Sequence, residues 1–283
     1  MPDRIVLVTG ATGRQGGAVV RSLVNRGFKL RGMTRHPEGE AAKTLRSLGI
    51  EVVHGDLDDE ASLAKALTGA WGVFAVQNTW EAGVEREETQ GKRLAKVARD
   101  RGVQHYVYTS VASAHRKTGI PHFENKWRIE QDVRKLKFPS HAILRPTFFM
   151  ENLSTPWFLH GDQLVTAMKP TTSLQMVAVE DIGRVGARFF TEAEKMNGRE
   201  IDLAGDAATM PRAAEVLSRS LGKTIRFAEI PLAEVRKSSE DMALMLEWFD
   251  KVGYDADIPA LEREFGKLTK LDAWASKAVG VQA

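Results

Sequence analysis

Short apolar runs alternate with longer amphipathic stretches through the first half of this chain. The run RIVLVTG at 4–10 is apolar almost throughout, as expected of a strand buried on both faces of a parallel sheet. The stretch 14–27 then places its valines and leucines at helical spacing, and Gly27 is its expected C-cap. The alternation continues with predicted strands at 29–35, 51–56, 72–78, 105–111 and 140–147, and with predicted helices at 40–49, 59–68, 85–101 and 122–136.

Regular alternation of strand and helix predicts an α/β fold of Rossmann type, a doubly wound parallel sheet with right-handed crossovers. The rhythm breaks after Pro146, where 147–173 mixes aromatic residues, proline and glycine, as a loop over a binding cleft or a loop that only caps the core. Further strands are predicted at 174–180, 199–205 and 224–230, with helices from Asp181 and after a Thr209 cap. We therefore predict two domains: a dinucleotide-binding domain at 1–153, and a smaller α+β lobe at 154–283 whose strands near 174–205 return to the main sheet.

Composition narrows the classes of partner. The 283 residues are 43% hydrophobic and 27% charged, which is typical of a globular protein. Lys and Arg exceed Asp and Glu by 40 to 37, a net charge of +3 without a basic block, so no direct nucleic-acid partner is expected. The absence of cysteine excludes disulfides, thiolate nucleophiles and Cys-ligated zinc, and no other metal site is expected. No apolar run approaches the roughly 18 residues of a membrane span, and the N-terminal run is too short for a signal peptide, so a cytoplasmic location without a membrane partner is expected.

Three glycines stand where the first strand gives way to the first helix, in the stretch LVTGATGRQGGAVV at 7–20. Gly10 suits a tight turn off the strand, Gly13 a close approach of backbone to a pyrophosphate, and Gly16 close packing of helix on strand. The N-terminus of the following helix supplies amide donors and a positive dipole end for an anion. A glycine triplet in this strand–helix context predicts a dinucleotide site; a tight turn without a ligand is the alternative.

The end of the second predicted strand bears on the choice of nucleotide. A site selective for NAD carries an acidic residue there, which accepts a hydrogen bond from the ribose 2′-hydroxyl. This chain reads MTRHP, with Arg35 in about that place. A guanidinium binds a 2′-phosphate through charged hydrogen bonds worth about 1.5–3 kcal/mol, so NADP(H) is predicted in preference to NAD(H). The alternative is that Arg35 is an ordinary solvated charge.

A lysine lies on the otherwise apolar face of the helix predicted at 122–136. Lys126 shares this face with His122, four residues earlier. Short-chain dehydrogenases keep such a lysine four residues after a catalytic tyrosine, but no Tyr-x-x-x-Lys occurs in this sequence. Lys126 and His122 are therefore the catalytic candidates, with His122 as a substitute proton donor. A purely structural role for His122 is the alternative.

Taken together, these segments resemble the NmrA-like family of atypical short-chain dehydrogenases, and within it the animal NADPH-sensing members of HSCARG type. The resemblance runs from residue 4 to about residue 275. It rests on the stretches TGATGRQGG, TRHP, GDLDD, VQNTWEA, QGKRLAKVAR, HFENK, LRPTFFMENL, VAVEDIG and LAGDAAT, which follow one another in the same order. The segment RHPEGEAAK departs from the lysine-rich pattern of the family, which leaves fewer cations beside the expected 2′-phosphate and weakens the expected preference for NADP.

The resemblance implies a set of cofactor-binding residues. Arg35 is expected at the 2′-phosphate and Lys126 at the nicotinamide ribose. The pyrophosphate is expected at Gly10, Ala11, Thr12, Gly13, Arg14, Gln15 and Gly16. The adenine is expected beside Asp56 and Leu57, the path to the nicotinamide at Gln77, Asn78 and Thr79, and the ring beside Phe149, Met150, Glu151 and Asn152.

Two functions remain open at this point. The first is a redox-sensing regulatory protein that binds NADP(H) without turnover and responds through a protein partner or a homodimer. The second is an NADPH-dependent oxidoreductase that reduces quinones, enones or carbonyls in an apolar acceptor pocket, with Trp80, Phe148, Phe149 and Trp157 as candidate lining residues. The missing tyrosine favours the first, and the same aromatic residues are also suited to the core.

Overall fold

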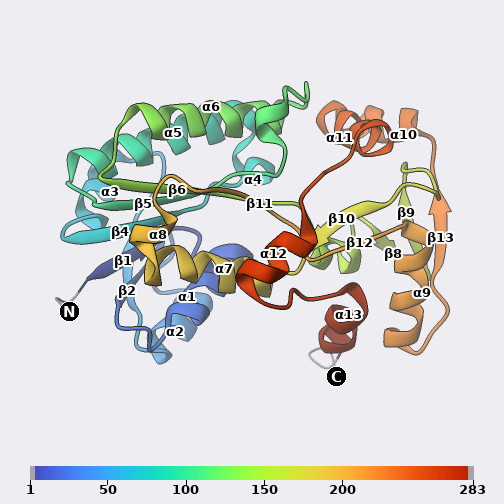
Figure 1. Cartoon of the computed structure of the whole chain (residues 1–283), viewed down its shortest axis with the longest axis horizontal. Coiled ribbons are helices and arrows are strands. Elements are labelled where there is room, and N and C mark those ends of the chain that lie inside the picture. The colour runs from blue at the N-terminus through green and yellow to red at the C-terminus, as the bar shows by residue number, and fades with distance from the viewer. Residues whose placement is uncertain (1–3, 280–283) are drawn as a thin grey trace. The chain divides into compact units, whose positions relative to one another are not determined.

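The computed structural model describes residues 4–279. Within them the strands of the main sheet follow the order β11-β6-β5-β4-β1-β2-β3 (Figure 1). Neighbouring strands from β3 to β6 pair in parallel, which confirms the predicted Rossmann-type α/β fold. The strands of this sheet are β1 (Ile5–Val8), β2 (Lys29–Thr34), β3 (Glu51–His54), β4 (Ala70–Ala75), β5 (His105–Thr109), β6 (Ser140–Pro146) and β11 (Glu200–Leu203).

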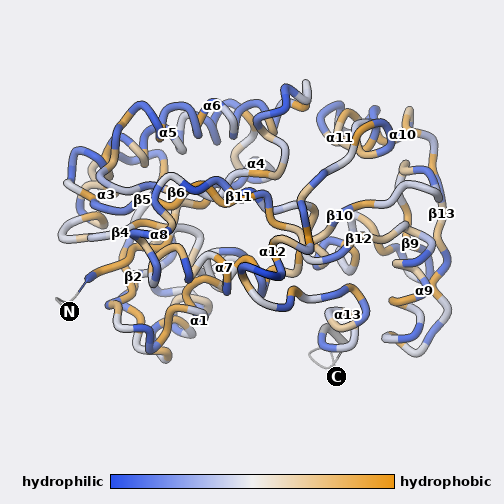
Figure 2. Tube along the Cα trace, viewed as in Figure 1, coloured by the Kyte–Doolittle hydropathy of each residue, from blue (hydrophilic) through white to orange (hydrophobic). Residues whose placement is uncertain are grey.

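Helices cover both faces of this sheet. Figure 1 shows α1 (Arg14–Leu23), α2 (Glu40–Ser47) and α7 (Val179–Thr191) on one face, and α3 (Glu60–Ala66), α5 (Val84–Asp100) and α6 (Pro121–Lys135) on the other. Hydrophilic and hydrophobic residues alternate along α5 and α6 (Figure 2), as expected of helices with one buried face. Helices α1 and α7 pack closely where Gly183 faces Ala18. A Cβ atom added at Gly183 would lie only 2.5 Å from the Ala18 carbonyl oxygen, so glycine permits this approach.

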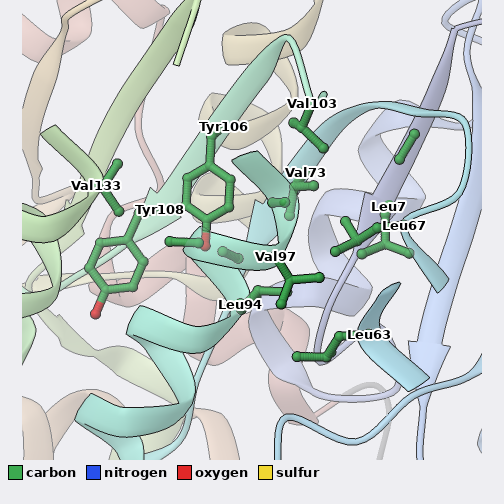
Figure 3. Close-up of a cluster of buried hydrophobic side chains, with 14 of the residues drawn as sticks. Leu7, Leu63, Leu67, Val73, Leu94, Val97, Val103, Tyr106, Tyr108 and Val133 are labelled. Atoms are coloured by element: carbon green, nitrogen blue, oxygen red, sulfur yellow. The ribbon is translucent and has the colours of Figure 1, made fainter. Parts of the chain in front are cut away.

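The core on the α3–α5–α6 face is built around β5. Tyr106 and Tyr108 of β5 are completely buried among leucine and valine side chains (Figure 3). The Tyr106 ring stacks on Phe138 with 4.6 Å between ring centroids. Burial raises the pKa of both phenols well above the ordinary value. These tyrosines are therefore packing residues in the described structure.

Glycines in the left-handed conformation terminate α2 and α5, but not α1. Gly102, at φ +77°, follows α5 and donates its amide hydrogen bond to the Arg99 carbonyl, as a C-terminal glycine should. Gly49, at φ +76°, follows α2, and its amide donates a hydrogen bond to the Arg46 carbonyl. The expectation for Gly27 was wrong: α1 already ends at Leu23, and a turn through Asn25, at φ +61°, separates the helix from Gly27.

The chain forms two compact units. Unit 1 comprises Met1–Ala114, His122–Arg145 and Ile182–Ile201, and unit 2 comprises His115–Pro121, Pro146–Asp181 and Asp202–Ala283. Of the strands within 174–205, β11 joins the main sheet, whereas β10 (Leu174–Val177) pairs with β7 (Phe148–Phe149) and β12 (Asp206–Ala208) in a second sheet. The limits 1–153 and 154–283 remain predictions, and their ends at 1–3 and 280–283 lie outside the described residues.

The other elements are short or belong to unit 2. A third sheet has the order β13-β9-β8. The remaining strands are β8 (Leu159–His160), β9 (Gln163–Thr166) and β13 (Arg226–Glu229). The remaining helices are α4 (Thr79–Ala82), η1 (Ala114–Arg116), η2 (Met150–Ser154), α8 (Ala193–Met196), α9 (Met210–Leu221), α10 (Leu232–Ser238), α11 (Glu240–Lys251), α12 (Ile258–Phe265) and α13 (Leu271–Val279).

Candidate functional site

The strand order reverses direction between β1 and β4, which are neighbours in the main sheet. Ligands of open α/β sheets bind outside the carboxyl ends of the strands at such a switch point. The two strand ends are tied together by Thr9, whose amide donates to the Phe74 carbonyl at 3.0 Å. The Thr9 hydroxyl also donates to the Val76 carbonyl at 2.9 Å and accepts from the Val76 amide at 2.7 Å. The loops that follow β1 and β4 are therefore held side by side in unit 1.

The glycine loop has the conformation expected for its turn and its packing. Gly10 has φ +57°, in the left-handed region, and its carbonyl accepts the Gly13 amide at 2.9 Å. A Cβ atom at Gly16 would lie 2.5 Å from the Gly10 carbonyl carbon and 2.6 Å from the Thr9 carbonyl oxygen. Only glycine fits at 16 without moving backbone, so the close contact of helix and strand end depends on it.

The start of α1 suits a diphosphate. Gly13 is the N-cap and brings no side chain, and the first turn contains Arg14, Gln15 and Gly16 without an acidic residue. The helix amides and the positive dipole end are therefore available to an anion, and the first turn itself adds no negative charge. The Gln15 side chain is engaged, since its Oε1 accepts a hydrogen bond from the Thr109 hydroxyl at 2.8 Å. Roles of 10–16 in pyrophosphate binding remain predictions.

The predicted 2′-phosphate residue already has a charged neighbour. Arg35, after β2, forms an ion pair with Glu81 of α4, and the two side chains are 50% and 53% exposed. The turn after β3 is fixed by its own contacts: Asp56 Oδ1 accepts the Asp58 amide at 2.9 Å, and the Leu57 carbonyl accepts from Arg93 at 2.7 Å. Sequence reasoning missed Glu81, although it lies in the quoted stretch VQNTWEA only two residues after Thr79.

Two buried polar side chains lie at the carboxyl ends of β4 and β5. Gln77 is 5% exposed, and within residues 4–279 neither its amide nitrogen nor its amide oxygen has a hydrogen-bond partner. The Ser110 hydroxyl, directly after β5, is also buried and has no hydrogen-bond partner within that range. Buried polar groups are nearly always paired, so groups like these at a switch point suit a polar ligand. Sequence reasoning missed Ser110, although its place at the end of a predicted strand was a usable signal.

The predicted lysine is held by a carboxylate that sequence reasoning did not identify. Lys126 of α6 forms an ion pair with Glu87 of α5, and the side chains are 13% and 0% exposed. Glu87 also accepts hydrogen bonds from the Thr79 hydroxyl and, at 2.8 Å, from the Asn125 amide. Burial raises the pKa of Glu87, but the Lys126 ammonium and these hydrogen bonds outweigh it and hold the pKa below its ordinary value. Glu87 is therefore a buried carboxylate anion.

A usable signal for Glu87 exists in the sequence. In α5 it falls on the buried face together with Gln90, Gly91, Leu94 and Ala98, at spacings of three, four, seven and eleven. A carboxylate on an apolar stripe requires a partner, because an unpaired charge is costly to bury. That partner comes from a different helix, so the sequence indicates the need for it without identifying Lys126.

Two other predicted residues of unit 1 lie at the start of α4 and in α6. Asn78 caps α4, since its Oδ1 accepts the Trp80 amide at 3.2 Å. His122 is buried at 6% exposure, and its ring centroid lies 5.2 Å from that of Trp80. The Trp80 side chain is 55% exposed. An accessible aromatic surface thus lies next to His122, which shares α6 with Lys126.

The segment expected beside the nicotinamide ring, from Phe149 to Asn152, lies in unit 2. Phe149 belongs to β7, and Met150 is fully buried. Glu151 Oε1 accepts hydrogen bonds from the Val179 amide at 3.0 Å and from the indole of Trp274 at 3.1 Å. This carboxylate therefore helps to fix the start of α7, and a role of the segment at the ring stays a prediction.

Residues 4–279 carry neither a metal cluster nor a membrane-spanning helix. In that range no three or more His, Asp or Glu side chains are grouped so that they could hold a metal ion. Nor does that range contain a helix with the length and apolar character needed to span a membrane.

Comparison with known proteins gives a consistent picture. The model of the NmrA-like family matches residues 2–275. An NmrA-like family domain-containing protein of Dictyostelium discoideum is 27% identical, with 96% of this chain and 97% of that protein covered. The NmrA-like family domain-containing oxidoreductase notA of an Aspergillus species is 42% identical, with 76% and 72% covered.

Solved structures share the fold at lower identity. NmrA, a negative transcriptional regulator, in complex with NADP superposes with a TM-score of 0.81 at 19% identity, over 100% of this chain and 97% of that one. The Citrobacter triphenylmethane reductase complexed with NADP(H) superposes with a TM-score of 0.82 at 23% identity, over 97% of this chain and 99% of that one. An NADPH-dependent quinone oxidoreductase of Escherichia coli superposes with a TM-score of 0.80 at 24% identity, over 96% of this chain and 99% of that one. At these identities the likeness establishes the fold.

Proposed function

The chain belongs to the NmrA-like family, and we propose that it is a redox-sensing protein that binds NADP(H) at the switch point between β1 and β4. The observation that carries the proposal is the set of groups at the carboxyl ends of the strands. The N-terminus of α1 takes the diphosphate, Arg35 the 2′-phosphate and Lys126 the nicotinamide ribose. Among the residues that the structure describes, the buried Gln77 amide has no hydrogen-bond partner, which supports a polar ligand in this place. Complexes of the structural neighbours with NADP(H) support the same ligand.

A sensor is favoured over an enzyme by the state of the tyrosines and of Lys126. Tyr106 and Tyr108 are fully buried, and burial raises their pKa, so neither is suited to donate a proton to a substrate. Lys126 is neutralised by Glu87 and has no tyrosine four residues before it. Sensing then requires two protein states that differ in affinity for NADP⁺ and NADPH, with the response passed to a protein partner or to a second copy of the chain.

The second candidate is an oxidoreductase that transfers hydride from NADPH to a quinone, enone or carbonyl. The exposed Trp80 ring beside His122 favours it, because an apolar acceptor could stack there and collect a proton from His122 or from water. The names of curated relatives include oxidoreductases, which supports the same reading.

One experiment separates these functions. The protein is titrated into NADPH while nicotinamide fluorescence is followed, and a panel of quinones and enones is then added while nicotinamide absorbance is followed. We expect saturable binding without turnover. Turnover would establish the oxidoreductase instead, and absence of binding for both NADPH and NADP⁺ would contradict both functions.

A further inference from the structure

Glu87 and Lys126 form a largely buried ion pair between α5 and α6. The Glu87 side chain is fully buried, and the Lys126 side chain is 13% exposed. Hydrogen bonds from Thr79 and Asn125 fix the carboxylate in addition to the ion pair. A buried carboxylate with three donors holds its charge and its position, so Lys126 faces a fixed negative charge.

The sheet order places this pair on one half of the proposed cofactor site. Thr79 follows β4, and α6, which carries Lys126, connects β5 to β6. Arg35 and Asp56 follow β2 and β3, on the other side of the switch point. A dinucleotide that crosses a switch point lays its two nucleosides over the two halves. If the 2′-phosphate of the adenosine lies at Arg35, the nicotinamide lies on the half of Glu87 and Lys126.

The two redox states of the cofactor differ in charge at that end, since the oxidised nicotinamide ring is a cation and the reduced ring is neutral. A bare ammonium nearby would disfavour the oxidised form. We propose that Glu87 tunes the redox preference of the site: by neutralising Lys126 it raises the affinity for NADP⁺ relative to the affinity for NADPH. The proposal rests on the proposed binding of NADP(H) and names the residue that would set which redox state the protein responds to.

The size of the effect follows from Coulomb's law. At an effective dielectric of about 40, between that of a charge pair near a protein surface and that of water, a unit charge about 6 Å from the ring changes the affinity ratio by about tenfold, or about 1.4 kcal/mol. A tenfold change in the ratio of the two dissociation constants shifts the two-electron potential of the bound couple by about 30 mV.

Charge-neutralising variants test the proposal directly. Dissociation constants for NADP⁺ and NADPH are measured at neutral pH for wild type and for Glu87→Gln, which keeps the side-chain shape. We expect Kd(NADP⁺)/Kd(NADPH) to rise about tenfold in Glu87→Gln. The double variant Glu87→Gln/Lys126→Met removes both charges, and its ratio is expected to return to within about threefold of wild type.

A matched control is provided by the next residue. Glu88→Gln removes the same charge from α5, but Glu88 pairs with Lys92 and Arg128 and not with Lys126. Its ratio should stay within about twofold of wild type. Should Glu87→Gln fail to fold, Lys126→Met alone is measured at about pH 8.5, where the unpaired carboxylate is ionised and should lower the ratio.

Three results would overturn the proposal: an unchanged ratio in Glu87→Gln, an equal change in Glu88→Gln, or a ratio in the double variant that stays at the Glu87→Gln value. These differ from failure of the proposed function, which is seen when wild type binds neither NADP⁺ nor NADPH.

Discussion

Replacing Lys126 by Met leaves Glu87 as a buried carboxylate without its counter-charge. The side chain of Glu87 is fully buried in the pair, and removing one partner of such a pair costs about 3–5 kcal/mol of unfolding free energy. The hydrogen bonds from Thr79 and Asn125 remain and stabilise the anion. We therefore expect Lys126→Met to lose about 3 kcal/mol of unfolding free energy at neutral pH, the lower end of that range. Urea unfolding of both proteins, followed by circular dichroism, measures the difference.

The difference should depend on pH in a defined direction. In wild type the pKa of Glu87 is lowered on folding, so its stabilisation is present above the unfolded pKa and is lost as pH falls through the folded pKa. In Lys126→Met burial dominates and raises the folded pKa, so the variant is stabilised by protonation and loses stability as pH rises through that pKa. Acidification therefore reduces the difference in unfolding free energy between wild type and Lys126→Met, which we call the deficit of the variant.

We therefore expect the deficit of Lys126→Met to shrink by more than half between about pH 8 and about pH 5. The matched control is Lys92→Met. It breaks the ion pair with Glu88, the neighbour of Glu87 in α5, at a position where the Lys92 side chain is 37% exposed. Such a pair is worth about 0–1 kcal/mol. A deficit in Lys126→Met below about 1 kcal/mol, or one that is constant over this pH range, would refute the assignment of Glu87 as a buried anion stabilised by Lys126.

The remaining predictions concern the proposed cofactor site. Arg35→Glu should weaken NADP(H) binding about tenfold to hundredfold while sparing NAD(H); equal loss for both in calorimetric titrations would contradict the 2′-phosphate role. Glu81→Gln should strengthen NADP(H) binding about two- to fivefold, because its carboxylate competes for Arg35, and an unchanged Kd would show no competition. Gly16→Ala should lower unfolding free energy by about 1–3 kcal/mol through backbone overlap; Gly17→Ala, whose Cβ would lie 3.2 Å from the Arg21 guanidinium and 3.3 Å from the Ala11 carbonyl, is the control and should cost less. His122→Phe should leave NADPH affinity unchanged; any wild-type turnover that this variant loses would assign His122 to the chemistry.

The fold could be predicted because its signals are local. Strands β1 (IVLV) and β4 (AWGVFA) are short apolar runs, and short strands alternate regularly with helices as far as β6, so the parallel direction of the strands follows from general rules. The error at Gly27 is also local: Asn25 adopts a left-handed conformation and ends α1 earlier than the glycine would.

The site could be predicted only in part because its charges are paired across elements. Lys126 and Arg35 stand out in the sequence, whereas Glu87 and Glu81, which face them, come from helices about 40 residues away along the chain. The helical spacing indicates that Glu87 is buried, but it does not identify the residue of another element that pairs with it. Glu151 shows the reverse case: a residue expected at the cofactor also holds the start of α7 and the indole of Trp274.

A crystal structure of the wild-type protein with NADPH tests the central claim most directly. We expect the diphosphate at the N-terminus of α1, the 2′-phosphate on Arg35 and the nicotinamide ribose within hydrogen-bond distance of the Lys126 ammonium. A dinucleotide bound with its diphosphate away from Gly13, or in the reverse orientation with the nicotinamide at Arg35, would contradict it.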